Sequence, residues 1–122
     1  MEFYYCEKCG NLFAVVHNAG PVPVCCGQDM ILLEAGVTDA AVEKHVPEVK
    51  REGNKIEVVV GSTVHPMTED HYIQMIAAVQ GEKVQIQKLS PSDEPKAAFE
   101  IADGPVEVYE FCNLHGLWKA EA

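Results

Sequence analysis

Basic residues are scarce in this chain, and long apolar runs are absent from it. Lysine and arginine number 9 against 19 aspartate and glutamate residues, which gives a formal net charge of -10. Because binding to phosphate groups requires clustered Lys and Arg, we expect no nucleic-acid partner. No apolar run approaches the roughly 20 residues that cross a bilayer, so we expect no membrane span and no membrane partner.

The N-terminal stretch also lacks the features of a secretory signal. It reads MEFYYCEKCG, without a basic start that leads into an apolar segment. We therefore expect a cytoplasmic protein, in which thiols stay reduced. In that compartment the 5 cysteines of the chain are read as metal ligands or reactive groups before they are read as disulfides.

Two regions of different composition divide the chain. Residues 1–36 carry four of the cysteines and show little apolar periodicity, so a region this short requires a metal in order to fold. Residues 37–122 carry short β-branched or alternating runs separated by Gly or Pro, which is typical of an all-β sandwich. Residues 37–46 could form a helical turn that Pro47 ends. The expected strands are 55–61, 71–80, 82–89, 97–103 and 105–112.

The early cysteines predict a metal site. They form a C-x-x-C pair, Cys6 and Cys9, followed by the adjacent pair Cys25 and Cys26. The C-x-x-C turn places two sulfurs on one tetrahedral metal. Side chains of adjacent residues diverge in an extended chain, so the second pair can reach the same metal only where the backbone turns sharply. Zinc and iron both suit four sulfurs, and the spacing does not choose between them.

A second site is predicted in the β-rich region. One late C-x-x-H pair, Cys112 and His115, shares that region with three more histidines, whereas His17 lies among the early cysteines and is expected to be exposed and not a ligand. Imidazole suits iron, copper, zinc and nickel, and one thiolate adds electron density to the metal. Five ligands leave one octahedral position open for a substrate. The predicted set is His45, His65, His71, Cys112 and His115.

Two of these histidines, His65 and His71, require a particular backbone path. Six residues apart on a strand, they would lie about 20 Å from each other, at about 3.3 Å per residue. They can share a metal only if the intervening PMTED segment turns back. Pro66 favours such a turn because it disfavours helical geometry at His65.

Three motifs then carry a specific resemblance. The stretches EKHVPE (43–48), GSTVHPMTEDHYI (61–73) and FCNLHGLWK (111–119) resemble those of desulfoferrodoxin, the two-iron class of superoxide reductase. The early C-x-x-C and Cys-Cys pairs are similar to its desulforedoxin-like centre. The likeness covers nearly the whole chain, in order and in spacing.

The resemblance implies a fold and a cofactor set. It implies a mainly β protein in which a desulforedoxin-like iron domain with four cysteine ligands, residues 1–36, precedes an immunoglobulin-like β-sandwich, residues 37–122, whose iron has four histidine ligands and one cysteine. It also implies that the four histidines ring the second iron, that Cys112 is its axial thiolate, and that the protein is a homodimer. The implied activity is one-electron reduction of superoxide to hydrogen peroxide, in superoxide detoxification, with a rubredoxin-like electron donor.

The resemblance also implies roles for the two charged residues that precede His45. Lys44 would attract superoxide and organise water for protonation, and Glu43 would occupy the open position of ferric iron. Two solvent-exposed charges would be the ordinary interpretation of such a pair. One departure from the family is Met75, where many members have Trp, and the run SDEPKAAFE is only loosely similar.

Two other functions compete with this interpretation. A blue-copper electron carrier also combines a β-sandwich with His and Cys ligands, but no Met follows His115 as a weak axial ligand, and His65 and His71 would be surplus. The second competing function is that of a zinc-ribbon binding module beside a β-domain of unrelated function. Metal content distinguishes the three interpretations. A two-iron superoxide reductase would hold two irons, a blue-copper carrier one copper, and a zinc-ribbon module one zinc.

Overall fold

A computed structural model describes residues 1–36, 45–61 and 65–122. By contacts, the chain divides into two compact units, Met1–Glu34 and Ala35–Ala122. The helical turn expected at 37–46 falls mostly on residues 37–44, which lie outside the described residues. Among the described residues, no helix is long and apolar enough to cross a membrane.

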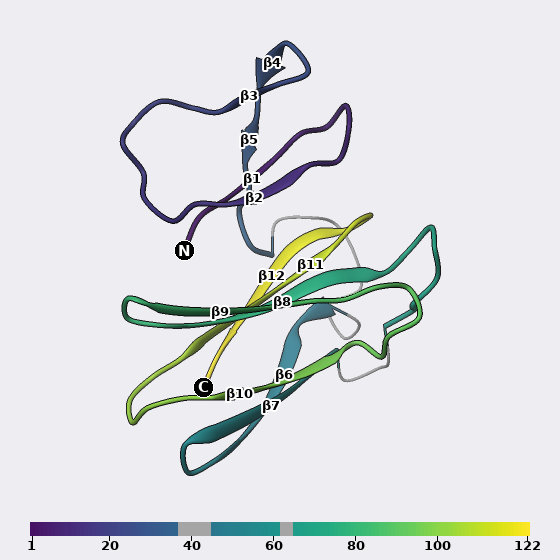
Figure 1. Cartoon of the computed structure of the whole chain (residues 1–122). Helices are drawn as coiled ribbons and strands as arrows, with labels where there is room; N and C mark the ends of the chain where they lie inside the picture. Colours follow the sequence, from purple (N-terminus) through teal and green to yellow (C-terminus); the bar gives the residue numbers. More distant parts are fainter. Residues whose placement is uncertain (37–44, 62–64) are drawn as a thin grey trace. The chain divides into compact units, whose positions relative to one another are not determined.

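The first unit consists of very short antiparallel strands. Its three-stranded sheet has the order β2-β1-β5, and β3 and β4 form a separate two-stranded ribbon (Figure 1). Its buried cluster contains Tyr4, Cys6 and Met30, with Val15 and Cys25 packed against them. The strands are β1 (Phe3–Tyr5), β2 (Leu12–Ala14), β3 (Val24–Cys25), β4 (Gln28–Asp29) and β5 (Ile31–Leu32).

The second unit is a β-sandwich. One sheet has the order β10-β7-β6 and the other β12-β11-β8-β9, and Figure 1 shows each set of strands running together. Mainly β structure in an immunoglobulin-like sandwich is therefore confirmed. The strands are β6 (Pro47–Glu52), β7 (Lys55–Val60), β8 (Ile73–Gln80), β9 (Lys83–Lys88), β10 (Lys96–Glu100), β11 (Glu107–Cys112) and β12 (Gly116–Glu121).

Alternation along the strands builds the sandwich core. On β7, Ile56, Val58 and Val60 are fully buried while the residues between them are exposed, because successive side chains point to opposite faces. They pack in one cluster with β8 and β11 residues that include Ile76 and Val108. This unit therefore has its own hydrophobic core, independent of any bound metal.

Two strands of the sandwich were missed from the sequence. The strand β6 begins at Pro47, which we expected only to end a helical turn. Proline is tolerated there because it is the first residue of a strand at the edge of its sheet. The other missed strand is β12. Met75, the departure noted above, is 4% exposed and lies opposite Phe111 on β11, so it serves as a packed apolar residue.

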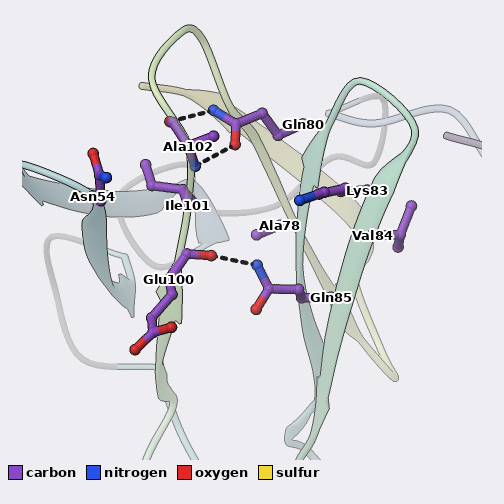
Figure 2. A pocket seen from close by; sticks show the side chains of 9 residues that line it. All are labelled: Asn54, Ala78, Gln80, Lys83, Val84, Gln85, Glu100, Ile101 and Ala102. Carbon is purple, nitrogen blue, oxygen red and sulfur yellow. Dashed lines mark hydrogen bonds between the residues drawn. The ribbon is translucent and has the colours of Figure 1, made fainter.

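Side-chain amides join the two sheets at the end of β8 that Gln80 occupies (Figure 2). The Gln80 carboxamide accepts a hydrogen bond from the backbone N–H of Ala102 at 2.8 Å and donates one to its carbonyl at 2.8 Å. Gln85 on β9 donates to the Glu100 carbonyl at 2.7 Å. These bonds satisfy backbone groups where the edge strands β9 and β10 do not pair with each other.

Candidate metal centres

The first cluster of sulfurs, which we call the four-cysteine cluster, has the spacing of a tetrahedral metal site. The sulfur atoms of Cys6, Cys9, Cys25 and Cys26 all lie within 4.8 Å of one another, with 3.5 Å between Cys9 and Cys25 and 3.9 Å between Cys25 and Cys26. Four sulfurs about 2.3 Å from one metal are about 3.8 Å apart. All five cysteines of the chain are free thiols, so disulfides do not explain this cluster.

Two turns bring these sulfurs together. In the C-x-x-C turn, the N–H of Gly10 donates to the Cys6 carbonyl at 2.8 Å. The adjacent pair lies at the β3–β4 hairpin, where Cys26 has a φ of 54° and Gly27 a φ of 76°. Two successive positive φ values are the signature of a tight two-residue hairpin. The sharp backbone turn expected at the adjacent cysteines is therefore present.

Proton affinities within the four-cysteine cluster favour a bound cation. The backbone N–H of Cys9 lowers the pKa of Cys6 to about 6, whereas the neighbouring Cys9 thiol raises the pKa of Cys26 to about 12. The pKa of Cys25 is also raised, first of all by Cys9. Four thiolates this close repel one another, and a divalent metal removes that penalty when it displaces the protons. The donor set thus fits zinc or iron.

The second cluster is a near-square of imidazole rings in the sandwich unit. Ring centroids lie 4.7 Å apart for His45–His65, 4.7 Å for His65–His71, 4.9 Å for His71–His115 and 4.8 Å for His45–His115. The diagonal from His45 to His71 is 6.5 Å. One ligand atom of each ring and the Cys112 sulfur all lie within 4.8 Å of one another, and we call these five residues the histidine–cysteine cluster. Two nitrogens on opposite sides of a metal, each about 2.1 Å from it, are about 4.2 Å apart, so the square fits one ion.

Two of the rings, those of His65 and His71, are placed by the turn expected between them. The backbone of Thr68 and His71 forms a bridge, with hydrogen bonds of 2.9 and 3.2 Å, so the segment turns back on itself. The Nδ1 atom of His65 lies 2.7 Å from the Pro66 carbonyl. A carbonyl only accepts, so Nδ1 must carry the proton, which leaves the lone pair of Nε2 for a metal.

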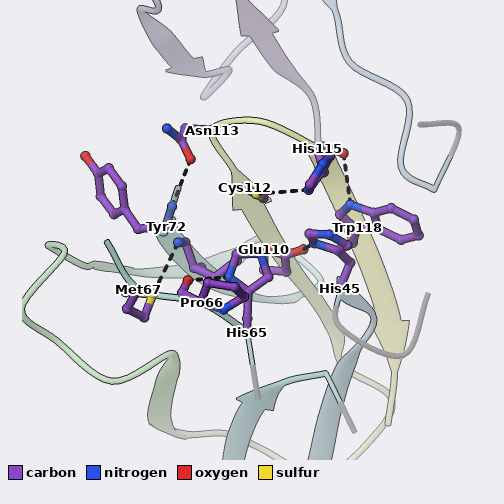
Figure 3. Close-up of polar contacts among 11 residues, drawn as sticks. His45, His65, Pro66, Met67, Tyr72, Glu110, Cys112, Asn113, His115 and Trp118 are labelled. Carbon is purple, nitrogen blue, oxygen red and sulfur yellow. Dashed lines mark hydrogen bonds and ion pairs between the residues drawn. The ribbon is translucent and has the colours of Figure 1, made fainter. Parts of the chain in front are cut away.

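The thiol and the fourth ring lie on the β11–β12 hairpin (Figure 3). Cys112 pairs with Gly116, whose φ of 83° closes a three-residue loop between the strands. The Cys112 sulfur lies 3.9 Å from Nδ1 of His115. Cys112 is 0% exposed, and burial raises the pKa of its thiol, so a bound cation would favour its thiolate form.

Two buried neighbours of the histidine square were missed from the sequence. Glu110 is 0% exposed, with its carboxylate 3.9 Å from Nδ1 of His45, and burial raises its pKa well above the usual value. Trp118 stacks on His45 with ring centroids 5.1 Å apart and donates from Nε1 to the His115 carbonyl at 3.1 Å. The signal for Glu110 was available, because it lies two residues before Cys112 on one strand and therefore on the same face.

Three other predicted positions complete the comparison with the sequence. Glu43 and Lys44 lie outside the described residues, so their predicted roles remain predictions. His17 is exposed, as expected, and it lies in neither of the two clusters found among the described residues. All nine predicted metal ligands fall in the two clusters, four in the first and five in the second.

Comparisons with known proteins agree with this arrangement. Residues 37–121 match the family described as "Desulfoferrodoxin", and residues 1–33 match "Desulfoferrodoxin, N-terminal domain". A relative from Syntrophotalea carbinolica, named "Desulfoferrodoxin", is 48% identical over 99% of this chain and 96% of its own length. A relative from Archaeoglobus fulgidus, named "Desulfoferrodoxin homolog", is 48% identical over 98% of this chain and 96% of its length.

Solved structures give the same fold. The superoxide reductase from Treponema pallidum is 35% identical, covers 97% of this chain and 98% of its own, and superposes with a TM-score of 0.78. A one-iron superoxide reductase from Giardia intestinalis is 34% identical, with a TM-score of 0.58, and covers 66% of this chain and 97% of its own.

Proposed function

Since the chain belongs to the desulfoferrodoxin family, we propose that it is a superoxide reductase. The reaction adds one electron and two protons to superoxide and yields hydrogen peroxide, without releasing dioxygen. The observation that supports it is the square of four imidazoles with one buried thiol beside it. Such a set would hold one redox metal ion through four imidazole nitrogens and one sulfur and would leave room on that ion for a small anion.

Both ligand clusters would hold iron. The four-cysteine cluster and the histidine–cysteine cluster each suit it, and the mixed set of imidazoles and one thiolate favours a redox metal over zinc. When bound in the second cluster, iron supplies the electron that superoxide receives. Residues 1–36 would form the first iron domain and residues 37–122 the reductase domain.

The protein groups around the second cluster hold its ligands in place. The thiolate of Cys112 would donate electron density to a bound metal, and its 0% exposure keeps water and oxidants from the sulfur. Trp118 covers one face of the His45 ring and binds the His115 backbone, so it restrains two ligands at once. Glu110 lies on the Nδ1 side of His45, with its carboxylate 3.9 Å from that nitrogen, where its charge would favour a ring that carries its proton at Nδ1.

Glu43 and Lys44 would act on the substrate side. Because they immediately precede His45 in the sequence, their long charged side chains would be able to reach a substrate bound at the second cluster. The ammonium of Lys44 would attract the superoxide anion and organise water that delivers protons. The carboxylate of Glu43 would compete for the vacant position after the electron has left, when the metal is harder and binds oxygen ligands better.

Three further properties are proposed from the family alone. The electron donor would be a rubredoxin-like protein, the assembly a homodimer, and the compartment the cytoplasm. Each can be tested directly, by reduction kinetics with a purified rubredoxin, by sedimentation of the whole protein, and by cell fractionation.

Metal analysis combined with a superoxide assay tests the proposed activity. The purified chain should hold two irons and consume superoxide stoichiometrically with its reductant, without evolving dioxygen. A matched Cys9→Ser variant should lose the absorption of the four-cysteine cluster and retain superoxide reduction, since each ligand set comes from its own unit. A metal-binding electron carrier would hold metal and accept electrons, yet superoxide would decay no faster than with metal-free protein, and that result would refute the proposal.

A further inference from the structure

We propose that Asn113 is a positioning residue whose carboxamide sets the His71 ligand relative to the Cys112 thiolate. This inference depends on the proposed metal centre, since it concerns how tightly that centre holds its ion. It does not depend on which substrate the centre reduces. Asn113 lies in the three-residue loop between Cys112 and Gly116, on the hairpin that carries two of the five ligands.

The Asn113 side chain contacts the residues on both sides of His71. Its Oδ1 accepts a hydrogen bond from the backbone N–H of Tyr72 at 2.9 Å, shown in Figure 3. Its Nδ2 donates to the backbone carbonyl of Asp70 at 3.0 Å. In addition, its backbone N–H donates to the Tyr72 carbonyl at 3.3 Å. One side chain thus holds the peptide groups that flank a metal ligand.

These bonds continue the sheet where its regular ladder ends. The pairing of β11 with β8 shifts register between Phe111 and Cys112, and the last pair joins Cys112 to Ile73. A β-bulge of this kind interrupts the regular hydrogen-bonded pairing of the two strands and bends the strand that carries the extra residue. Beyond it, His71 belongs to the Thr68–His71 bridge, which is a separate local turn. The carboxamide of Asn113 connects this turn to the hairpin at the point where backbone pairing stops.

The chemistry of the contact requires an amide. One partner is an N–H, which needs an acceptor, and the other is a carbonyl, which needs a donor. Asparagine offers both on a short side chain, whereas aspartate offers two acceptors and leucine offers neither. Asn113 therefore offers the one acceptor and the one donor that its two backbone partners need, on a side chain that reaches both.

The expected consequence is tighter retention of the metal. Loss of a group that orients a ligand costs roughly 10- to 100-fold in metal affinity. Loss of Asn113 should therefore speed iron release from the histidine–cysteine cluster by roughly that factor. The four-cysteine cluster draws its ligands from the other unit, so its absorption provides an internal reference in the same sample.

The test compares two Asn113 variants with a control elsewhere in the sandwich. Asn113→Leu keeps the branched shape and the number of side-chain heavy atoms without polar groups, and Asn113→Ala removes the bulk as well. The control is Gln80→Ala, because Gln80 also accepts from one backbone N–H and donates to backbone carbonyls (Figure 2). Gln80 lies at the opposite end of β8 from Ile73, about 23 Å away at about 3.3 Å per residue.

Two readouts are used on the iron-loaded whole chain. The first is the rate at which a chelator removes iron from the histidine–cysteine cluster, and the second is the wavelength of its thiolate-to-iron absorption band. Both Asn113 variants should release iron roughly 10- to 100-fold faster and show a shifted band, while Gln80→Ala resembles wild type in both. Release as slow from both Asn113 variants as from Gln80→Ala would overturn the proposal. So would a wild-type rate in Asn113→Leu alone, because volume would then explain the effect.

A superoxide assay of the wild-type chain separates this inference from the proposed function. If the wild type holds iron and consumes no superoxide, the proposed function fails, and iron release still decides the role of Asn113. If the wild type reduces superoxide and all variants release iron at one rate, only the role of Asn113 fails.

Discussion

The two ligand clusters differ in what surrounds them. The four-cysteine cluster lies in a unit whose strands are two or three residues long and whose buried cluster includes one of the ligands, Cys6. The histidine–cysteine cluster lies at one end of a sandwich with an extended apolar core, in which Cys112 is packed with residues such as Ile73. In the first unit a ligand, Cys6, is one of the three residues of the buried cluster, whereas in the second Cys112 joins a core made mainly of apolar residues that are not ligands.

This difference indicates opposite relations between metal and fold. A unit as short as Met1–Glu34 buries too little apolar surface to be stable alone, so metal binding must supply folding free energy. The sandwich can fold first and present its imidazoles already arranged. A preorganised set holds the metal in the geometry that the reaction needs, because the protein does not relax around the ion.

The largest expected effect is on the fold of the first unit when metal is removed. Structural metal binding contributes roughly 10–16 kcal/mol in small metal-dependent domains, more than a unit of this size can replace. In the metal-free whole chain, backbone amides of β1 such as Tyr5 should lose protection from hydrogen exchange, while those of β7 and β11 keep it. Equal protection of both units after metal removal would show that the first unit folds without metal.

A large effect is expected when the buried thiol is replaced in Cys112→Ser. A hydroxyl donates far less electron density than a thiolate, so superoxide reduction should fall by more than the roughly 10- to 100-fold typical of outer contacts. The rate is measured per iron bound, which separates catalysis from metal loss. Cys9→Ser, at an exposed ligand of the other cluster, is the matched control and should keep the rate. Undiminished turnover in an iron-loaded serine variant contradicts the role of the thiolate.

A smaller effect is expected for Lys44→Ala, which tests local against global charge. One positive charge about 6 Å from an anion contributes roughly 0.7 to 2.8 kcal/mol between the dielectric of water and an effective value of about 20. Superoxide capture should therefore slow roughly 3- to 100-fold. Rapid-kinetic measurements at several salt concentrations should show a wild-type rate that falls with ionic strength, despite the net charge of -10. A rate that rises with salt would instead show that the overall negative charge controls the encounter with superoxide.

The smallest effect concerns stability of the sandwich away from its metal ligands. Tyr109 donates to the Glu107 carboxylate at 2.8 Å, and this bond, followed by Lys119, lowers the pKa of Glu107. A lowered folded-state pKa stabilises the fold above the ordinary value near 4.5, and the stabilisation is lost as pH falls through the folded-state pKa. Tyr109→Phe should cost below about 1 kcal/mol at pH 7, because Glu107 is partly exposed. Urea unfolding of both proteins should show this difference shrinking as pH falls below the ordinary pKa of 4.5, and a constant difference would contradict the assignment.

Much of the fold was predictable from periodicity. The alternation in 55–61 predicted β7, because one buried face imposes a period of two. The short run 105–112 predicted β11, which is buried on both faces from Val108 to Cys112. The strand β6 was missed because Pro47 was interpreted only as the end of a helical turn. The strands of the first unit are too short to show any period, since β3 to β5 have two residues each.

The candidate metal ligands could be predicted from the sequence, whereas the residues that support them could not. Residue chemistry predicted nine candidate ligands, which the structure brings into two clusters, because thiols and imidazoles at such density have few other uses. It did not identify Asn113 or Trp118, whose types are common in loops and cores. Their partners are polar groups of other segments, such as the backbone of Tyr72, and no residue pattern in the sequence predicts these contacts.

The sequence by itself determined which atoms could bind metal and which neighbours would pair, as in the C-x-x-C turn and the C-x-x-H loop. Short spacings are informative because a few bonds restrict how far two side chains can separate. Only the tertiary structure decided that His45, His65, His71 and His115 form one square, and that Glu110 and Trp118 lie against it. His45, the segment 65–71 and the hairpin 110–118 are far apart along the chain, so the distances between them depend on strand register and on the packing of two sheets, which no local pattern specifies.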